Sequence, residues 1–102
     1  MPIQKIKIIF SKISDMRFIS HLDLVRLFQR VLRRADLPVA ITQGYSPRIK
    51  ISISRALKLG VESRAEEAVF YMDRHIEPSD FIKRFNEKSP QGVAVLTAEE
   101  IN

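Results

Sequence analysis

Residues 17–52 have the sequence RFISHLDLVRLFQRVLRRADLPVAITQGYSPRIKIS, and they decide the fold. Ser20, with Asp23 three residues later, approximates a capping box, which starts a helix. Pro38 disfavours helix at the residue before it. We therefore predict a helix over residues 20–35. Its apolar residues recur at helical spacing, so that one face can pack on a sheet. That face consists of Leu24, Leu27, Phe28, Val31, Leu32 and Ala35.

Strands are predicted where apolar and polar residues alternate or where a short apolar run occurs. They cover residues 5–12, 49–55, 65–72 and 93–96, with residues 38–42 as an optional extra strand. A second helix begins at Glu77 and Pro78, because proline is favoured in the first helical turn. Its apolar face consists of Phe81, Ile82 and Phe85. Without the optional strand, the order β-α-β-β-α-β predicts a ferredoxin-like α+β sandwich, with two helices on one face of a mainly antiparallel sheet.

The composition is typical of one small soluble domain over residues 1–102, since 45% of the residues are hydrophobic and 28% are charged. No apolar run approaches the roughly 20 residues that span a bilayer, so no membrane contact is expected. The amino end resembles a strand and not a signal peptide, which makes the cytoplasm the expected compartment. The chain has no cysteine, which excludes disulfides, thiolate metal sites and thiol nucleophiles.

Positive charge is concentrated in the first half of the chain. Residues 1–50 carry ten basic and three acidic side chains, whereas residues 51–102 carry seven basic and nine acidic ones. This asymmetry predicts one basic face and one neutral or acidic face.

Four arginines form a stripe on the polar side of the first predicted helix. They are Arg26, Arg30, Arg33 and Arg34. At 100° per residue they fall within about 100° of one another. Guanidinium groups make bidentate contacts with phosphates, so the stripe predicts contacts with an RNA backbone. The alternative is an ordinary solvated face, because Asp23 lies one turn before Arg26 and the late arginines suit the helix dipole.

The loop at residues 43–48, QGYSPR, combines amide, aromatic and basic side chains. Tyr45 would stack on a base, Gln43 would contact a base edge and Arg48 would hold a phosphate. Lys50 adds a further positive charge on the following strand. The alternative is a rigid turn in which Tyr45 covers the edge of the core.

His21 directly follows the predicted cap of the first helix. An imidazole can act as a general acid or base near neutral pH, or it can donate a hydrogen bond that fixes the start of the helix. We favour the structural role, because His75 is distant in sequence. The residues contain no phosphate-binding glycine loop and no zinc-protease motif, and we expect neither a metal nor a cofactor.

Together these segments resemble the radical SAM-linked protein family. That family is a domain of unknown function, found as the carboxyl-terminal part of certain radical S-adenosylmethionine (SAM) proteins or as a separate chain. The matching segments are RFISHLDL at 17–24, RRA at 33–35, LP at 37–38, QGYSPR at 43–48, KIS at 50–52 and LGVES at 59–63, together with Glu66. Family members usually continue past the last residue of this chain. The resemblance therefore implies either a short version or the amino-terminal half of a longer domain. It also implies a radical SAM partner, and any iron–sulfur cluster would lie on that partner.

We expect a non-catalytic RNA-binding or substrate-recruiting module that works with a radical SAM enzyme. One alternative is a protein-interaction domain whose arginine face docks on an acidic patch of that enzyme. Another alternative is a metal-independent ribonuclease that uses His21. The non-catalytic function is favoured, because one histidine with no neighbouring catalytic partner is weak evidence for an active site.

Overall fold

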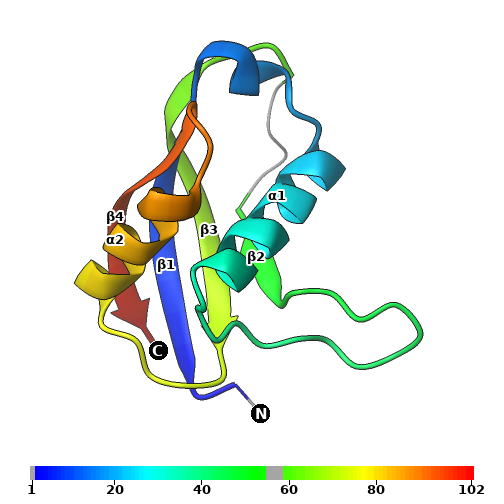
Figure 1. The fold of residues 1–102 in the computed structure, drawn as a ribbon, viewed down its shortest axis with the longest axis vertical. Coiled ribbons are helices and arrows are strands. Elements are labelled where there is room, and N and C mark those ends of the chain that lie inside the picture. The colour runs from blue at the N-terminus through cyan, green and yellow to red at the C-terminus, as the bar shows by residue number, and fades with distance from the viewer. Residues whose placement is uncertain (1, 55–58) are drawn as a thin grey trace.

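A computed structural model describes residues 2–54 and 59–102 of the chain. These residues form two layers, in which two helices cover one face of a four-stranded antiparallel sheet (Figure 1). The strands are β1 (Gln4–Lys12), β2 (Ile51–Ile53), β3 (Ser63–Met72) and β4 (Val93–Ile101). The helices are α1 (His21–Arg34) and α2 (Pro78–Lys88), and a short 3-10 helix, η1 (Ser14–Phe18), links β1 to α1. The strand order β2-β3-β1-β4 confirms the predicted ferredoxin-like α+β sandwich.

The start of α1 confirms the cap predicted from the sequence. Ser20 has extended backbone angles, and its Oγ accepts a hydrogen bond from the backbone N–H of Asp23 at 3.1 Å. The predicted apolar face is buried against the sheet, from Leu24 to Ala35. Position and rotation of α1 therefore follow directly from its sequence, and its opposite face is left to solvent.

The core is built around the ring of Phe28 on α1. Phe28 is fully buried, and its ring lies 5.3 Å from that of Phe10 on β1 and 5.4 Å from that of Phe70 on β3, centroid to centroid. A third ring, Phe85 on α2, lies 5.8 Å away. All three pairs are close to edge-on, which is a favoured arrangement of aromatic rings.

Two predicted strands differ from the structure in length. Residues 51–53 of the predicted strand at 49–55 form β2, and backbone hydrogen bonds of Lys50 and Ser54 extend its contact with β3, whereas Arg55 lies outside the described residues. The last strand, predicted at 93–96, continues to Ile101, because it pairs with β1 along nearly its whole length. Residues 38–42 do not form a full strand. They contribute two isolated bridges, Val39 with Met72 and Ile41 with Ile49.

Neither described helix has the length and apolar content needed to cross a membrane.

Candidate functional site

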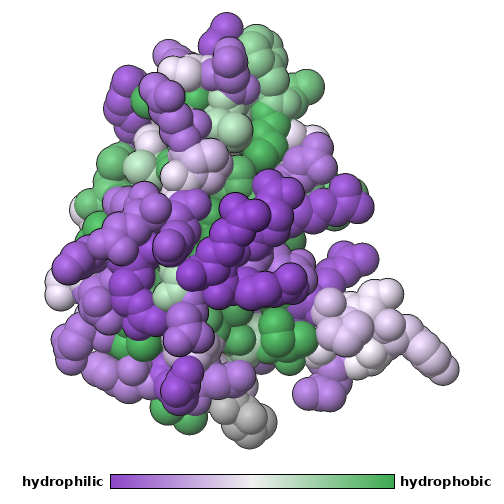
Figure 2. All heavy atoms as spheres, viewed as in Figure 1, coloured by the Kyte–Doolittle hydropathy of each residue, from purple (hydrophilic) through white to green (hydrophobic). Residues whose placement is uncertain are grey.

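The predicted arginine stripe lies on the solvent side of α1. Arg26, Arg30, Arg33 and Arg34 are all exposed. Arg26 pairs with Asp23 at 3.4 Å, and both groups are well exposed, so this pair contributes little to stability. Among the described residues, the guanidinium groups of the other three make no ion pair. Strongly hydrophilic side chains gather over α1 in Figure 2.

The loop at residues 43–48 closes a narrow arm that extends away from the body of the protein (Figure 1). Thr42 holds its base, because its backbone N–H donates to the Arg48 carbonyl at 2.7 Å and its Oγ1 accepts from the Arg48 N–H at 3.1 Å. Gly44 has a φ of 128°, which favours glycine. Tyr45 near the tip is fully exposed, so it does not cover the edge of the core.

One side of the arm faces the first turns of α1 across a groove of about 220 Å³. Arg48 lines this groove from the arm, whereas His21 and Arg26 line it from the helix. Leu22, Val25 and Gln29 complete the lining. The structure thus brings together three of the predicted residues, which are far apart in sequence, at one surface that is both cationic and partly apolar.

Two other predicted residues, Gln43 and Lys50, line a separate hollow of about 510 Å³. Its remaining walls are Pro2, Ala40, Ile41, Thr42 and Asp73. The sequence predicts one basic face, but the structure divides the predicted residues between the groove beside α1 and this second hollow. Arg30, Arg33 and Arg34 line neither hollow and form an open row along α1.

His21 is exposed within the groove, and within the described residues its side chain makes no hydrogen bond. The structure thus gives no support to the predicted bond that would fix the start of α1. His75 is elsewhere, where its Nε2 lies 3.1 Å from Glu100 Oε1. Residues 2–54 and 59–102 contain no group of three or more His, Asp or Glu side chains that could hold a metal ion.

Sequence patterns missed two residues that the fold places beside Lys50. Tyr71 on β3 has the Lys50 ammonium 5.0 Å from its ring centroid, and the Lys5 ammonium of β1 lies 5.7 Å from the same centroid. Alternation along β1 and β3 does place Lys5 and Tyr71 on the outer face of the sheet. Their pairing depends on strand register, which joins positions 66 residues apart and is not readable from either strand alone.

Comparisons with known proteins identify a family. None of the curated proteins matches the chain. Residues 5–102, nearly the full length, match the model of a bacterial family. The chain therefore belongs to the family described as "Uncharacterized protein conserved in bacteria (DUF2344)".

Proposed function

We propose that this protein is a non-catalytic RNA-binding module that presents its RNA to a radical SAM enzyme. One observation carries the proposal, namely that Arg26 and Arg48 converge on one groove beside an open row of arginines. Arginine binds phosphate through its planar fork, so such a row suits a polyanion better than a small neutral ligand. The side chains of Leu22 and Val25 give the groove an apolar part that fits a sugar or a base edge.

The dimensions of α1 also suit a nucleic-acid backbone. Arg26 and Arg34 are eight residues apart, which is about 12 Å along the helix axis. Phosphates in one strand of a DNA duplex rise by about 3.4 Å per nucleotide, and on that scale the row spans about three to four nucleotides. Arg30 and Arg33 lie between its ends, and neither has a carboxylate partner among the described residues.

The radical SAM part of the proposal is supported by the resemblance of residues 17–66 to the radical SAM-linked family. The chain has no cysteine, so it lacks the thiolates that hold an iron–sulfur cluster. Under this proposal the catalytic cluster belongs to the partner, and this chain contributes affinity for the substrate.

Salt-dependent binding tests the RNA part directly. The affinity for tRNA and rRNA fragments should fall with salt, and each lost phosphate contact should reduce the log–log slope by about 0.7 to 0.9. We expect this reduction for Arg26→Gln and for Arg48→Gln. Arg74→Gln is the matched control, because Arg74 is exposed and lies in the connection between β3 and α2. Absent or salt-insensitive binding, or an equal effect of the control, would refute the proposal.

A second candidate function, docking on a protein partner, is favoured by an apolar patch beside η1. Phe18, Leu59 and Val61 are each at least half exposed. Phe18 and Gly60 are adjacent, because the Gly60 N–H donates to the Arg17 carbonyl at 2.6 Å. Exposed apolar clusters often mark protein contacts. Co-purification of a radical SAM enzyme without nucleic-acid absorbance, lost in Phe18→Ser, would favour docking as the main function.

A cleavage assay distinguishes the predicted ribonuclease from the RNA-binding function and from the docking function. RNA cleavage that disappears in His21→Ala while binding persists would favour the ribonuclease. Unchanged RNA after incubation with the wild-type protein would leave His21 as a lining residue of the groove.

A further inference from the structure

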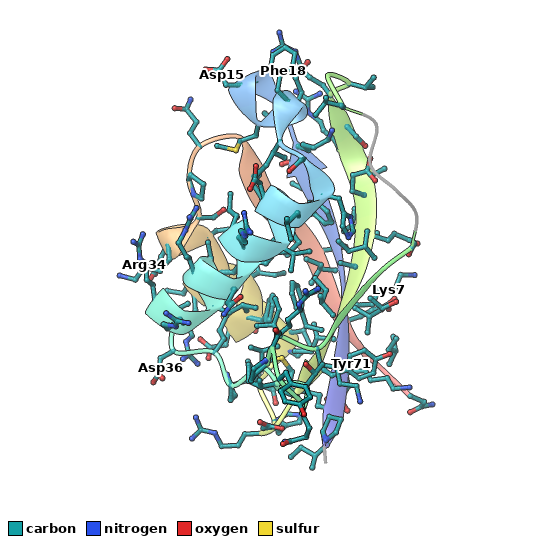
Figure 3. All side chains as sticks on the ribbon, turned by 90° about the vertical axis from the view of Figure 1, so that its right-hand side faces the viewer. Lys7, Asp15, Phe18, Arg34, Asp36 and Tyr71 are labelled. Atoms are coloured by element: carbon teal, nitrogen blue, oxygen red, sulfur yellow. The ribbon has the colours of Figure 1, made fainter. Side chains whose placement is uncertain are left out.

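The lysines on the helix-free face of the sheet differ in their partners. Lys7 on β1 lies between two carboxylates, with its Nζ 3.4 Å from Glu67 Oε1 and 4.0 Å from Glu99 Oε1. Lys5, two residues before Lys7 on β1, and Lys50 make no ion pair among the described residues, and the Lys5 Nζ donates a long hydrogen bond to the Asn102 carbonyl at 3.5 Å. Figure 3 shows Lys7 and Tyr71 on the sheet side of the molecule and Arg34 on the helix side. At the end of this face that carries Lys5 and Lys50, two ammonium groups are therefore without a paired carboxylate, and Glu100 and Asp73 line the hollows beside them.

Tyr71 lies between those two lysines. Its ring centroid is 5.0 Å from the Lys50 ammonium and 5.7 Å from the Lys5 ammonium, within the range of a cation–π contact. Tyr71 is half-buried, and its backbone is fixed by pairing with Lys5 on the neighbouring central strand. The ring is thus held in place by the sheet, unlike the fully exposed ring of Tyr45 at the tip of the arm.

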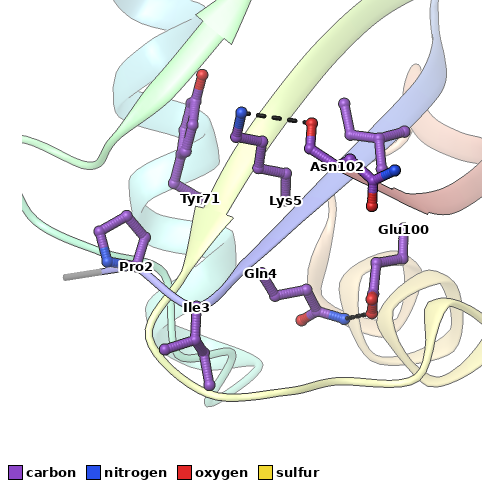
Figure 4. Close-up of a pocket in the computed structure, with 8 residues that line it drawn as sticks. Pro2, Ile3, Gln4, Lys5, Tyr71, Glu100 and Asn102 are labelled. Carbon is purple, nitrogen blue, oxygen red and sulfur yellow. Dashed lines mark hydrogen bonds between the residues drawn. The ribbon is translucent and has the colours of Figure 1, made fainter.

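Lys5, Tyr71 and Lys50 form a row across this face of the sheet, the Tyr71 row, and a hollow lies on each side of it. One, of about 250 Å³, is lined by Lys5 and Tyr71 together with Pro2, Ile3, Gln4, Glu100, Ile101 and Asn102 (Figure 4). The other is the hollow of Gln43 and Lys50 described above. Pro2 lines both, so the two hollows adjoin. Gln43, whose amide can both donate and accept, lines the second hollow beside Lys50.

We infer that a single-stranded RNA segment lies across this end of the sheet, with one base stacked on Tyr71 and its flanking phosphates held by Lys5 and Lys50. The inference rests on the RNA binding proposed above and adds a second subsite to it. A base reaches an aromatic ring on a sheet only when it is free of its own duplex stack, which selects single-stranded over paired RNA. An acidic peptide would use the two ammonium groups but would leave the ring without a partner.

The tyrosine content of the chain makes the subsite directly observable. The chain has two tyrosines and no tryptophan, so Tyr45→Phe leaves Tyr71 as the only tyrosine. We expect the ring NMR resonances of Tyr71 in this variant to move upfield on titration with a short oligouridylate, in a saturable manner. Prehybridising the oligouridylate with oligoadenylate should abolish the shift. This readout requires no substitution at Tyr71 itself, so it does not depend on whether a variant folds.

Variants then assign the roles of the three side chains. Tyr71→Leu should weaken oligouridylate binding about 5- to 150-fold, the range found for loss of one stacked base, whereas Tyr71→Phe should bind like wild type. Lys5→Gln and Lys50→Gln should each lower the log–log salt slope by about 0.7. Lys7→Gln is the matched control on the same face and should leave the slope unchanged, because two carboxylates already occupy Lys7.

The outcomes separate this subsite from the proposed function. RNA binding that weakens in Arg26→Gln and Arg48→Gln while the Tyr71 resonances stay fixed would overturn the subsite alone. Absence of any RNA binding would overturn the subsite and the proposed function together. An oligoglutamate that shifts the Tyr71 resonances as strongly as oligouridylate would also overturn the subsite, because it would show that the ring only senses charge on the lysines.

Discussion

Replacing Phe28 by leucine tests whether one aromatic cluster holds the helix layer on the sheet. Phe28 is the only residue of α1 whose ring meets rings of β1, β3 and α2, at centroid distances between 5.3 and 5.8 Å, among the described residues. Leucine keeps much of the apolar surface but has no ring. The substitution therefore isolates the edge-to-face contacts and the small void that remains.

The expected loss of stability follows from those three contacts. Each edge-to-face pair contributes about 0.5 to 1.5 kcal/mol beyond its buried area, so three pairs give about 1.5 to 4.5 kcal/mol. The residual cavity adds to this loss. For a domain of this size, each kcal/mol lowers the melting temperature by about 4 to 8 °C. We therefore expect the melting temperature of Phe28→Leu to fall by at least about 6 °C.

Phe18→Leu provides the same chemical change at a site outside the core. Phe18 is 55% exposed, and the Arg17 guanidinium lies over its ring, 4.3 Å from the centroid. Exposed cation–π contacts contribute about 0.5 to 1 kcal/mol, so this variant should lose no more than that. Urea unfolding of both variants with unchanged m-values gives the comparison. If Phe28→Leu loses no more stability than Phe18→Leu, the aromatic cluster does not hold the layers together.

Two further substitutions, each with a matched control, probe the junctions that place α1 and β4. Arg84→Met removes the hydrogen bonds from the Arg84 guanidinium to the carbonyls of Ala35 and Asp36 at the end of α1, and it should lower the free energy of unfolding by about 1.5 to 3 kcal/mol. Asp80→Asn, which removes the i,i+4 ion pair of Arg84 and the negative charge in the first turn of α2, should lose about 1 kcal/mol or less in the same urea titration. Gly92→Ala should be clearly more destabilising than Gly44→Ala by calorimetry. Both glycines have positive φ, but a Cβ at Gly92 would lie 2.7 Å from Met16 Cγ, whereas a Cβ at Gly44 meets nothing within 4 Å. Equal melting temperatures for the two glycine variants would contradict the packing of η1 against the loop before β4.

Local sequence patterns predicted the parts of the fold whose burial alternates cleanly. The Ser20 cap marks the start of α1, and the spacing of its apolar residues marks its buried face. Residues of β1 and β3 alternate between the core and the outer face of the sheet over most of each strand. The second half of β4 was missed because its inward positions are not large and apolar. Ala98 is small, and the Glu100 carboxylate accepts a hydrogen bond from the buried Gln4 amide at 2.7 Å. Its strand structure comes from pairing with β1, which lies some 90 residues earlier in the chain.

The candidate site was predicted as a set of residues but not as an arrangement. Arg48 and Lys50 are two residues apart, so simple alternation places both on one face of a strand. The structure places them in different hollows. Lys50 still follows the edge of β3, because its carbonyl accepts from the Tyr71 N–H at 3.1 Å, whereas Arg48 lies in the arm beyond Ile49, which bridges Ile41. No local pattern in residues 43–50 specifies that change of partner, since it depends on where residues 38–42 run after α1.

The arm at residues 43–48 gives the two proposed RNA surfaces a physical relation. Arg48 faces the groove beside α1, whereas Gln43 faces the hollow that adjoins Tyr71. The α1 row offers guanidinium groups to a backbone and no aromatic ring for a base, so it suits phosphates whether the RNA is paired or not. The Tyr71 row requires an unpaired base. A stem with a single-stranded extension satisfies both requirements when it bends around the arm, whereas a continuous duplex satisfies only the first. Specificity for RNA shape would then arise from the distance that the arm imposes between the two surfaces, and not from any single base contact.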